Sequence, residues 1–140
     1  MTGDGLDPLI GDWELTADLP GAEDMRGLVT FERFGPLLLQ RSTAPDPVPD
    51  SICLIAPHAD GGYTQHYFDS RGVVRLYAMT FDGQTWTLER TEPDFSPLDF
   101  HQRYIGTLAD DGSVITGEWQ ASDDGTTWQR DFRLSHRRAG

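Results

Sequence analysis

The sequence predicts an all-β protein, an antiparallel up-and-down meander of about ten strands that closes into a barrel. Asp82-Gly83, Asp111-Gly112 and Asp124-Gly125 each separate two alternating segments. Asp-Gly between alternating runs indicates a hairpin, because these residues tolerate the positive φ of tight turns. No helix-length apolar stripe follows the first few residues. A chain of sequential hairpins has two open sheet edges, and barrel closure removes both of them.

The individual elements follow from alternation and turn residues along the 140-residue chain, which we expect to form one domain over 1–140. Residues 6–10 predict a short helical turn before the first strand. The connections are nearly all short, which favours an up-and-down barrel over a Greek-key sandwich. We expect strands at about 11–17, 25–34, 37–43, 51–56, 63–69, 73–81, 85–91, 100–108, 113–122 and 127–137.

Two proline-containing segments, 44–50 and 92–99, cannot be strands. Proline fixes φ and removes a backbone donor, so it interrupts a sheet ladder. If both loops lie at one end of the barrel, they would act as lids over an internal cavity. Phe95 and Leu98 would then face the ligand. Ordinary surface loops or an oligomer contact are an equally good interpretation.

The charge balance limits the class of partner. The chain has 23 acidic and 11 basic residues, a formal net charge of −12. An acidic surface disfavours nucleic acid and anionic membranes as partners. No segment approaches the ~18 apolar residues of a membrane span, and the N-terminus lacks the features of a signal peptide. We therefore expect a cytoplasmic monomer or homodimer whose partner is a small molecule.

Several kinds of reactive site lack sequence support. The histidines, His58, His66, His101 and His136, have no metal-ligand spacing, so we expect no metal site. The single cysteine, Cys53, excludes an internal disulfide, and its apolar neighbours predict a buried, inert thiol. There is no Gly-x-Ser-x-Gly elbow and no glycine-rich phosphate loop.

The barrel interior remains as the candidate site. Alternation over 73–81 places Arg75, Tyr77 and Met79 on a face that is too apolar for water, so this face is expected to point inward. In 100–108 we favour the set containing Gln102 and Tyr104 over the set containing His101. The predicted ligand-binding residues are Arg75, Tyr77, Met79, Gln102, Tyr104, Trp119 and Trp128, together with Phe95 from the second loop.

An apolar pocket with a few converging polar groups is typical of small-molecule sites. A buried arginine needs a partner, because an unpaired buried charge is costly. For Arg75 the candidates are Glu32, Glu89, Asp131 or a carboxylate of the ligand. The first hypothesis is therefore a barrel that binds a small apolar or aromatic ligand, and a barrel filled by its own side chains is the structural alternative.

A second hypothesis is a cofactor-independent enzyme of the cyclase, isomerase or decarboxylase type. Arg75 and Tyr77 would orient or polarise the substrate, and a carboxylate or a histidine such as His66 would move a proton. A shaped, dry cavity supplies much of what such reactions need.

Two stretches resemble known families. Leu9-Ile10-Gly11-Asp12-Trp13 resembles the Gly-x-Trp opening strand of lipocalins and related calycins. The resemblance implies that Trp13 closes one end of the barrel and that an arginine of the last strand stacks on it. Arg133 and Arg137 are the candidates for that arginine.

The second resemblance covers residues 67–138. Tyr67-Phe68-Asp69-Ser70-Arg71-Gly72-Val73, then Arg75-x-Tyr77, Phe100-x-Gln102-Arg103-Tyr104, Gly117-x-Trp119 and Ser122-x-Asp124-Gly125-x-x-Trp128-x-x-Asp131-Phe132 resemble an uncharacterised, mostly actinobacterial family of small calycin-like proteins. This resemblance implies the barrel fold and supplies no activity.

Nitrobindin-type haem barrels also have ten strands and open with Gly-x-Trp. Similarity to them would imply a haem held by His136. The surrounding residues, Leu134-Ser135-His136-Arg137-Arg138, depart from a clear match. We therefore expect no cofactor and keep haem binding as a second alternative.

Overall fold

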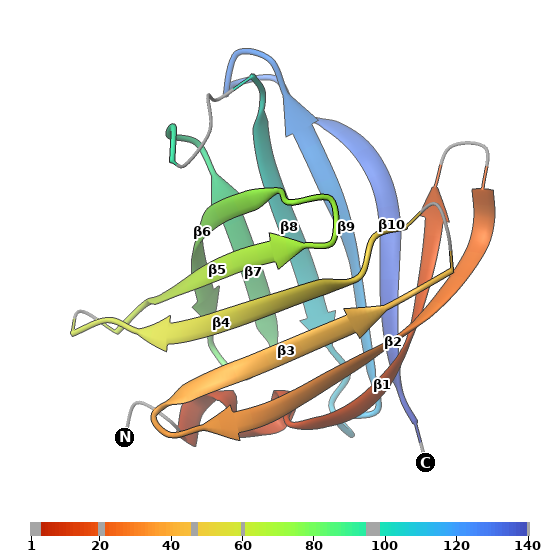
Figure 1. The fold of residues 1–140 in the computed structure, drawn as a ribbon, viewed down its shortest axis with the longest axis vertical. Coiled ribbons are helices and arrows are strands. Elements are labelled where there is room, and N and C mark those ends of the chain that lie inside the picture. The colour runs from red at the N-terminus through yellow and green to blue at the C-terminus, as the bar shows by residue number, and fades with distance from the viewer. Residues whose placement is uncertain (1–3, 20–21, 46–47, 60, 95–98, 140) are drawn as a thin grey trace.

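A computed structural model describes residues 4–19, 22–45, 48–59, 61–94 and 99–139 of the chain. Within these residues, ten antiparallel strands form one closed barrel in the order β1-β10-β9-β8-β7-β6-β5-β4-β3-β2 (Figure 1). The elements are η1 (Asp4–Leu9), β1 (Gly11–Leu19), β2 (Ala22–Phe34), β3 (Leu37–Thr43), β4 (Ser51–Pro57), β5 (Tyr63–Asp69), β6 (Val74–Phe81), β7 (Thr85–Arg90), β8 (His101–Leu108), β9 (Val114–Ser122) and β10 (Gln129–Arg138). The predicted all-β meander and its N-terminal helical turn, which is a 3-10 helix, are confirmed.

The Asp-Gly pairs form turns as predicted. Gly83, Gly112 and Gly125 have φ values of 98°, 76° and 76°. Each preceding aspartate accepts hydrogen bonds from backbone N–H groups further along its turn, as Asp124 does from Thr126 and Thr127, both at 2.8 Å. Side-chain capping and positive φ together fix these turns, and with them the register of the hairpins.

The first and last strands close the barrel. β1 pairs with β10 from Trp13↔Arg138 to Asp18↔Arg133. The β1–β2 hairpin is longer than the sequence predicted, because its pairing extends to Leu19↔Ala22 beyond a register shift.

One end of the barrel is closed by the N-terminal helix and the first tryptophan. Leu6 and Leu9 of η1 are buried, at 2% and 0% exposure, and Trp13 is fully buried. The Trp13 indole Nε1–H donates a hydrogen bond of 2.9 Å to the Leu9 carbonyl. The indole N–H of this fully buried residue is thereby satisfied, as a buried tryptophan requires.

An arginine of the last strand stacks on Trp13, but it is neither Arg133 nor Arg137. The Arg138 guanidinium carbon lies 4.0 Å from the centre of the Trp13 ring. Arg138 also donates hydrogen bonds to the carbonyls of Pro8, Ile10 and Gly112. The prediction was wrong because β10 extends one residue further than expected. Trp13 of β1 therefore pairs directly with Arg138 of β10.

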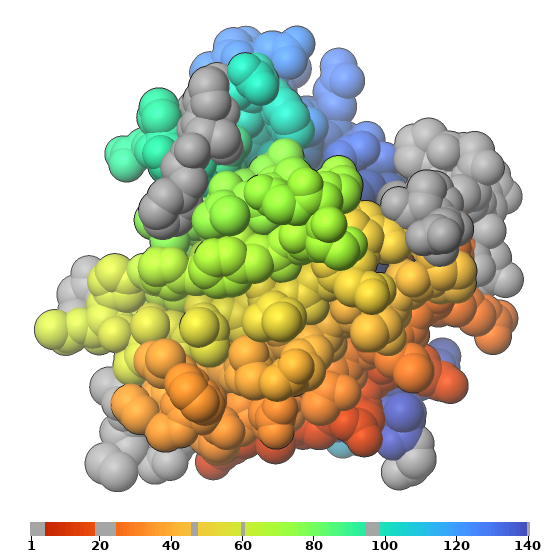
Figure 2. All heavy atoms as spheres, viewed as in Figure 1, coloured from red at the N-terminus to blue at the C-terminus, as the bar shows by residue number. Residues whose placement is uncertain are grey.

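The outer face of the barrel is formed by the strand residues that alternate with the inward-facing ones. Figure 2 views this face over β3, β4, β5 and β6, whose side chains form a continuous surface. Ile52 and Phe68 are paired across β4 and β5 on this face and are 42% and 40% exposed.

Candidate ligand-binding cavity

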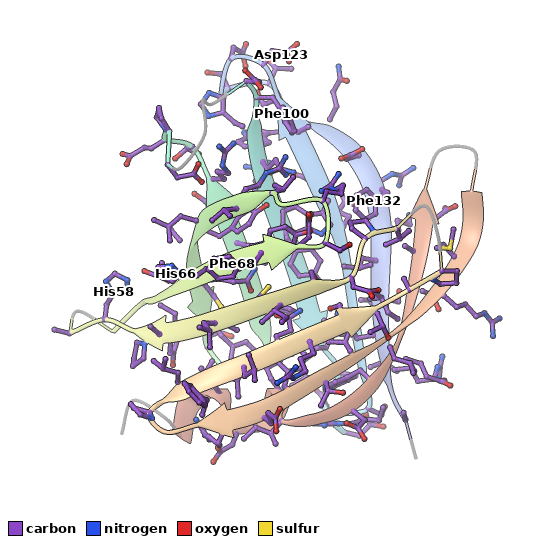
Figure 3. The ribbon with its side chains drawn as sticks, viewed as in Figure 1. His58, His66, Phe68, Phe100, Asp123 and Phe132 are labelled. Atoms are coloured by element: carbon purple, nitrogen blue, oxygen red, sulfur yellow. The ribbon has the colours of Figure 1, made fainter. Side chains whose placement is uncertain are left out.

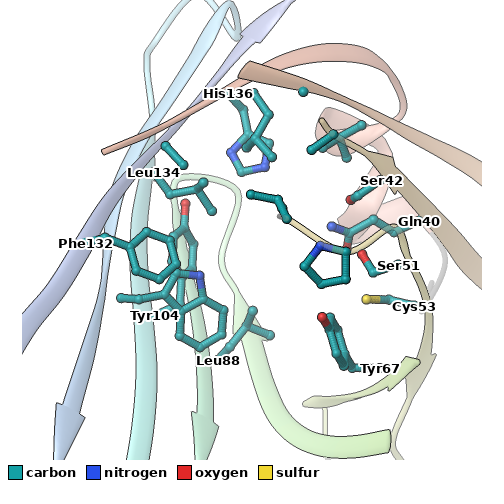
Figure 4. Close-up of a pocket in the computed structure, with 18 of the residues that line it drawn as sticks. Gln40, Ser42, Ser51, Cys53, Tyr67, Leu88, Tyr104, Phe132, Leu134 and His136 are labelled. Atoms are coloured by element: carbon teal, nitrogen blue, oxygen red, sulfur yellow. The ribbon is translucent and has the colours of Figure 1, made fainter. Parts of the chain in front are cut away.

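The barrel interior contains a cavity of about 410 Å³. Most of its surface is apolar or aromatic. Leu88, Phe132 and Leu134 line it (Figure 4), and Trp119 lines it as well. The polar side chains that line it include Gln40, Gln65, Arg75, Gln102 and His136. A cavity of this size and lining is within the range of small-molecule sites, so the barrel is not filled by its own side chains.

Three predicted residues converge on one point of the wall. Arg75 and Tyr77 of β6 both donate hydrogen bonds to Gln102 Oε1 of β8, at 3.1 and 3.2 Å. Burial raises the pKa of the Tyr77 phenol, whereas its hydrogen bond with Arg75 acts to lower it. The predicted inward faces of 73–81 and 100–108 are confirmed at these positions.

The described residues of the 44–50 loop and the β5–β6 turn line one part of the cavity, and we call this part the mouth. Ala44, Val48 and Pro49 line it from the loop, and Arg71 lines it from the turn. The loop is held by the Asp50 backbone N–H, which donates to Ser70 Oγ at 3.2 Å. Ala44, Val48 and Pro49 of the first proline loop therefore line the cavity, and the role of the two loops as lids stays a prediction.

Arg71 at the mouth already has an anionic partner. Its guanidinium forms an ion pair of 2.6 Å with Asp69, and the Tyr67 hydroxyl donates to the same carboxylate at 2.8 Å. Burial acts to raise the pKa of Asp69, but hydrogen bonds from Arg71, Tyr67 and the backbone lower it to about 2. At neutral pH this carboxylate is therefore ionised, and Arg71 and Tyr67 are its partners.

The second proline loop begins with a buried ion pair. Arg90, at the end of β7, donates hydrogen bonds of 2.9 Å to both carboxylate oxygens of Asp94. Asp94 also accepts the backbone N–H of Leu76 at 2.8 Å. Phe95 and Leu98, which we predicted to face the ligand, lie outside the described residues.

Aromatic rings form a continuous wall through the cavity. Successive ring centroids lie 5.8 Å apart for His136–Trp86, 5.1 Å for Trp86–Tyr104, 5.4 Å for Tyr104–Trp119 and 5.6 Å for Trp119–Tyr77. Edge-to-face and tilted packing at these distances is favourable. The predicted positions of Tyr104 and Trp119 inside the barrel are confirmed.

The Tyr104 ring packs against Gly106 and Gly117, where a larger residue would leave no space for it. A Cβ at Gly106 or Gly117 would lie 2.5 or 2.6 Å from the Tyr104 hydroxyl oxygen. These glycines face each other across β8 and β9. The phenol is 1% exposed, and burial raises its pKa.

His136 lies at the inner end of the cavity, opposite the mouth. Its imidazole contacts the Trp13 ring edge to face at 6.3 Å, next to the closed end of the barrel, and points into the cavity (Figure 4). Burial lowers the pKa of His136 to about 4, so the imidazole is neutral at neutral pH. The sequence interpretation did not include His136 among the pocket residues, although Phe132, Leu134 and His136 share one alternating face of β10.

The cavity wall concentrates buried polar atoms without partners. Among the described residues, six buried side-chain polar atoms have no hydrogen-bond partner, and five of them belong to residues that line this cavity. An unsatisfied buried polar atom costs about 1–3 kcal/mol, and native proteins contain few of them. The five atoms are Gln40 Oε1, Gln65 Oε1, Trp86 Nε1, Tyr104 OH and His136 Nδ1.

Trp128 was predicted to line the pocket and does not. It lies on the outside of the barrel, where the Arg103 guanidinium stacks 4.1 Å from its ring centre. The physical reason is a register shift between Arg130 and Phe132 in the β9–β10 pairing. The shift reverses the alternation, so Trp128 and Arg130 face outward while Phe132 faces inward.

Two further predicted site residues lie elsewhere. Met79 points inward but is packed in the core, 1% exposed, and does not line the cavity. His66 lies between the inward-facing Gln65 and Tyr67, so it projects from the outer face of β5 (Figure 3). The predicted catalytic set of Arg75, Tyr77 and His66 is therefore not assembled.

Cys53 is buried in the cavity wall, as predicted. Burial raises the pKa of its thiol to about 12, so the group is protonated and unreactive as a nucleophile. Within the described segments, no group of three or more His, Cys, Asp or Glu side chains is placed to hold a metal ion. No helix in the same segments is long and apolar enough to span a membrane.

No protein-family model matches the chain, and no curated protein matches it either. The arguments about function therefore depend on the cavity itself.

Proposed function

We propose that this protein binds a small, largely aromatic organic molecule inside the barrel. The observation that carries the proposal is the cavity of about 410 Å³, whose wall is largely aromatic and holds five of the six unpartnered buried polar atoms found in the described residues. A ligand with hydrogen-bonding groups would satisfy some of those atoms and recover part of their desolvation cost. A calycin-like barrel that is closed at one end is consistent with this role.

The charge of the ligand is argued from Arg75, one of three arginines that line the cavity together with Arg26 and Arg71. Arg71 is paired with Asp69. Arg75 is only half-buried, and its hydrogen-bond acceptor is the neutral amide of Gln102; among the described side chains, no carboxylate forms an ion pair with it. An arginine in an apolar wall binds carboxylates well, because its fork of donors matches their geometry. The ligand therefore carries a carboxylate that meets Arg75.

The two alternatives receive less support. The enzyme hypothesis needs a carboxylate or a histidine such as His66 to move a proton, and His66 is not among the residues that line the cavity. For haem, His136 is inside the cavity, but its Nδ1 atom is buried with no hydrogen-bond partner in the described part of the chain. Metal-bound histidines almost always have a second-shell partner on their other ring nitrogen, so the surroundings of His136 do not fit an axial ligand. A haemin titration with a His136→Phe control tests this conclusion directly.

The experiment that tests the proposal is a calorimetric titration with 2-naphthoate, an aromatic carboxylate. We expect one molecule bound per chain. Leu134→Trp, which fills the cavity, should abolish binding. Ile105→Trp makes the same kind of change on the outer face, where Ile105 is 37% exposed, and should bind normally. If both variants bind 2-naphthoate normally, the ligand lies outside the cavity and the proposal is contradicted.

A further inference from the structure

The cavity has two chemically different ends. At the mouth, Arg75, Tyr77 and Gln102 form a cationic, hydrogen-bonded cluster. At the inner end, Trp86 and His136 lie with ring centroids 5.8 Å apart. Trp86 Nε1 and His136 Nδ1 are both buried without a partner, and no charged group is among the contacts that the structure gives these two side chains.

The inner pair has a specific hydrogen-bonding character. The indole N–H of Trp86 can only donate. A neutral imidazole donates from one nitrogen and accepts at the other, and burial lowers the pKa of His136 to about 4, which keeps it neutral. A group at this point must accept from Trp86 and must either donate to His136 Nδ1 or accept from it, depending on which ring nitrogen carries the proton. A hydroxyl can satisfy both side chains with either tautomer. A carbonyl oxygen does so only when Nδ1 is protonated, and an ammonium cannot accept from Trp86.

The wall between the two ends is aromatic throughout. The centroid steps from His136 through Trp86, Tyr104 and Trp119 to Tyr77 lie between 5.1 and 5.8 Å. Tyr77 then donates to Gln102, the residue that Arg75 also contacts. A planar ring system can lie along this wall with one substituent at each end.

We infer that the ligand is an elongated aromatic hydroxy acid, with its carboxylate on Arg75 at the mouth and its hydroxyl between Trp86 and His136 at the inner end. The inference rests on the proposed function and makes it more specific. It adds a second recognition point to the cavity and assigns the inner residues to substrate selection, separate from the binding of the carboxylate.

The test uses two matched probes, 2-naphthoate and 6-hydroxy-2-naphthoate, which differ by one hydroxyl. We expect the hydroxy acid to bind the wild-type protein about tenfold more tightly, the gain of one well-placed hydrogen-bonding group. Trp86→Phe and His136→Phe each keep a ring and remove the polar atom. In these variants the two probes should bind with equal affinity to each other, whatever the affinity of 2-naphthoate itself.

Two control variants complete the design. Arg75→Gln should weaken both acids by a similar factor and keep the advantage of the hydroxyl. His66→Phe makes the His136→Phe change on the outer face and should alter neither affinity. Trp86→Phe keeps the test valid if His136→Phe fails to fold, as judged by circular dichroism.

The outcomes separate the two claims. Equal affinities of the two probes for the wild type, or an advantage that survives in Trp86→Phe, would overturn the inner hydroxyl site and leave the proposed function standing. If neither acid binds to the wild-type protein, the proposed function fails and this inference fails with it.

Discussion

Arg75 of β6 donates a hydrogen bond of 3.1 Å to Gln102 of β8, a neutral amide, at the wall of a largely aromatic cavity. The acidic residues that the sequence offered as partners, Glu32, Glu89 and Asp131, do not pair with it; Glu32 forms an ion pair with Arg41 at 3.5 Å instead. The arginine is held in position by Gln102 and keeps donors for an incoming anion.

This arrangement predicts a charge-selective loss of binding. Arg75→Gln should weaken 2-naphthoate binding by about 10- to 100-fold, because a charge-assisted hydrogen bond is worth about 1.5–3 kcal/mol. Binding of the uncharged 2-naphthol should change less than threefold. Calorimetric titration of both probes measures the two effects, and an equal loss for both would show that Arg75 acts on cavity shape alone.

The stacking of Arg138 on Trp13 predicts a large effect on stability. Arg138→Gln removes a cation–π contact at 4.0 Å and hydrogen bonds to three backbone carbonyls around the closed end. We expect a loss of about 3 kcal/mol in the free energy of unfolding. Arg137→Gln, a neighbouring exposed position, should cost less than 0.5 kcal/mol. Urea denaturation of the two variants makes the comparison, and similar losses would contradict the assigned role of Arg138.

The packing of Tyr104 over Gly106 predicts a strong coupling between the two positions. A Cβ at Gly106 would lie 2.5 Å from the Tyr104 hydroxyl, and its three nearest heavy atoms all belong to Tyr104. Gly106→Ala should therefore destabilise the protein by about 1–3 kcal/mol, and the same substitution should cost much less in a Tyr104→Leu background. A double-mutant cycle by urea denaturation gives the coupling energy; additive effects would rule out this packing.

The buried imidazole of His136 predicts a pH-dependent stability. Its folded pKa is lowered to about 4, against about 6.5 in an unfolded chain. Between these values the unfolded chain takes up a proton that the folded protein does not, so this contribution is complete above pH 6.5 and is lost as the pH falls toward 4.

The measurement for His136 is urea denaturation at pH 7.5 and pH 4.5. Between these conditions the wild type should lose about 2–3 kcal/mol more than His136→Phe, where nothing at this position titrates. His66→Phe should keep the wild-type pH dependence. A pH dependence that is unchanged in His136→Phe would show that the pKa of this imidazole is the same in the folded protein as in the unfolded chain.

The fold followed from the sequence because its determinants are local. Asp-Gly turns and period-two alternation lie within a few residues of each other, and they fix the hairpins without knowledge of the rest of the chain. The same alternation placed Arg75, Tyr77, Gln102, Tyr104 and Trp119 inside correctly. Closure of the barrel then follows from the need to remove two sheet edges.

The wrong site predictions lie where a bulge interrupts the alternation of a strand, or where alternation alone does not decide between core and cavity. The register shift between Arg130 and Phe132 reverses which residues of β10 face inward. No residue type at that point of the sequence indicates a bulge. Met79 shows that an inward position does not decide between core and cavity, since that depends on depth along the barrel axis. His136 was missed although continuing the Phe132–Leu134 alternation by one step would have placed it inside.

The central claim is that a ligand enters this cavity, and the four tryptophans of the chain report on it in one spectrum. Trp86 and Trp119 line the cavity, Trp13 donates to Leu9 at the closed end, and Trp128 lies outside under Arg103. The first measurement is a nitrogen-15 correlation spectrum of the indole N–H signals during titration with 6-hydroxy-2-naphthoate. We predict shifts of Trp86 and Trp119 with Trp128 unchanged; a shift confined to Trp128, or no shift at saturating probe, would contradict ligand binding in the barrel.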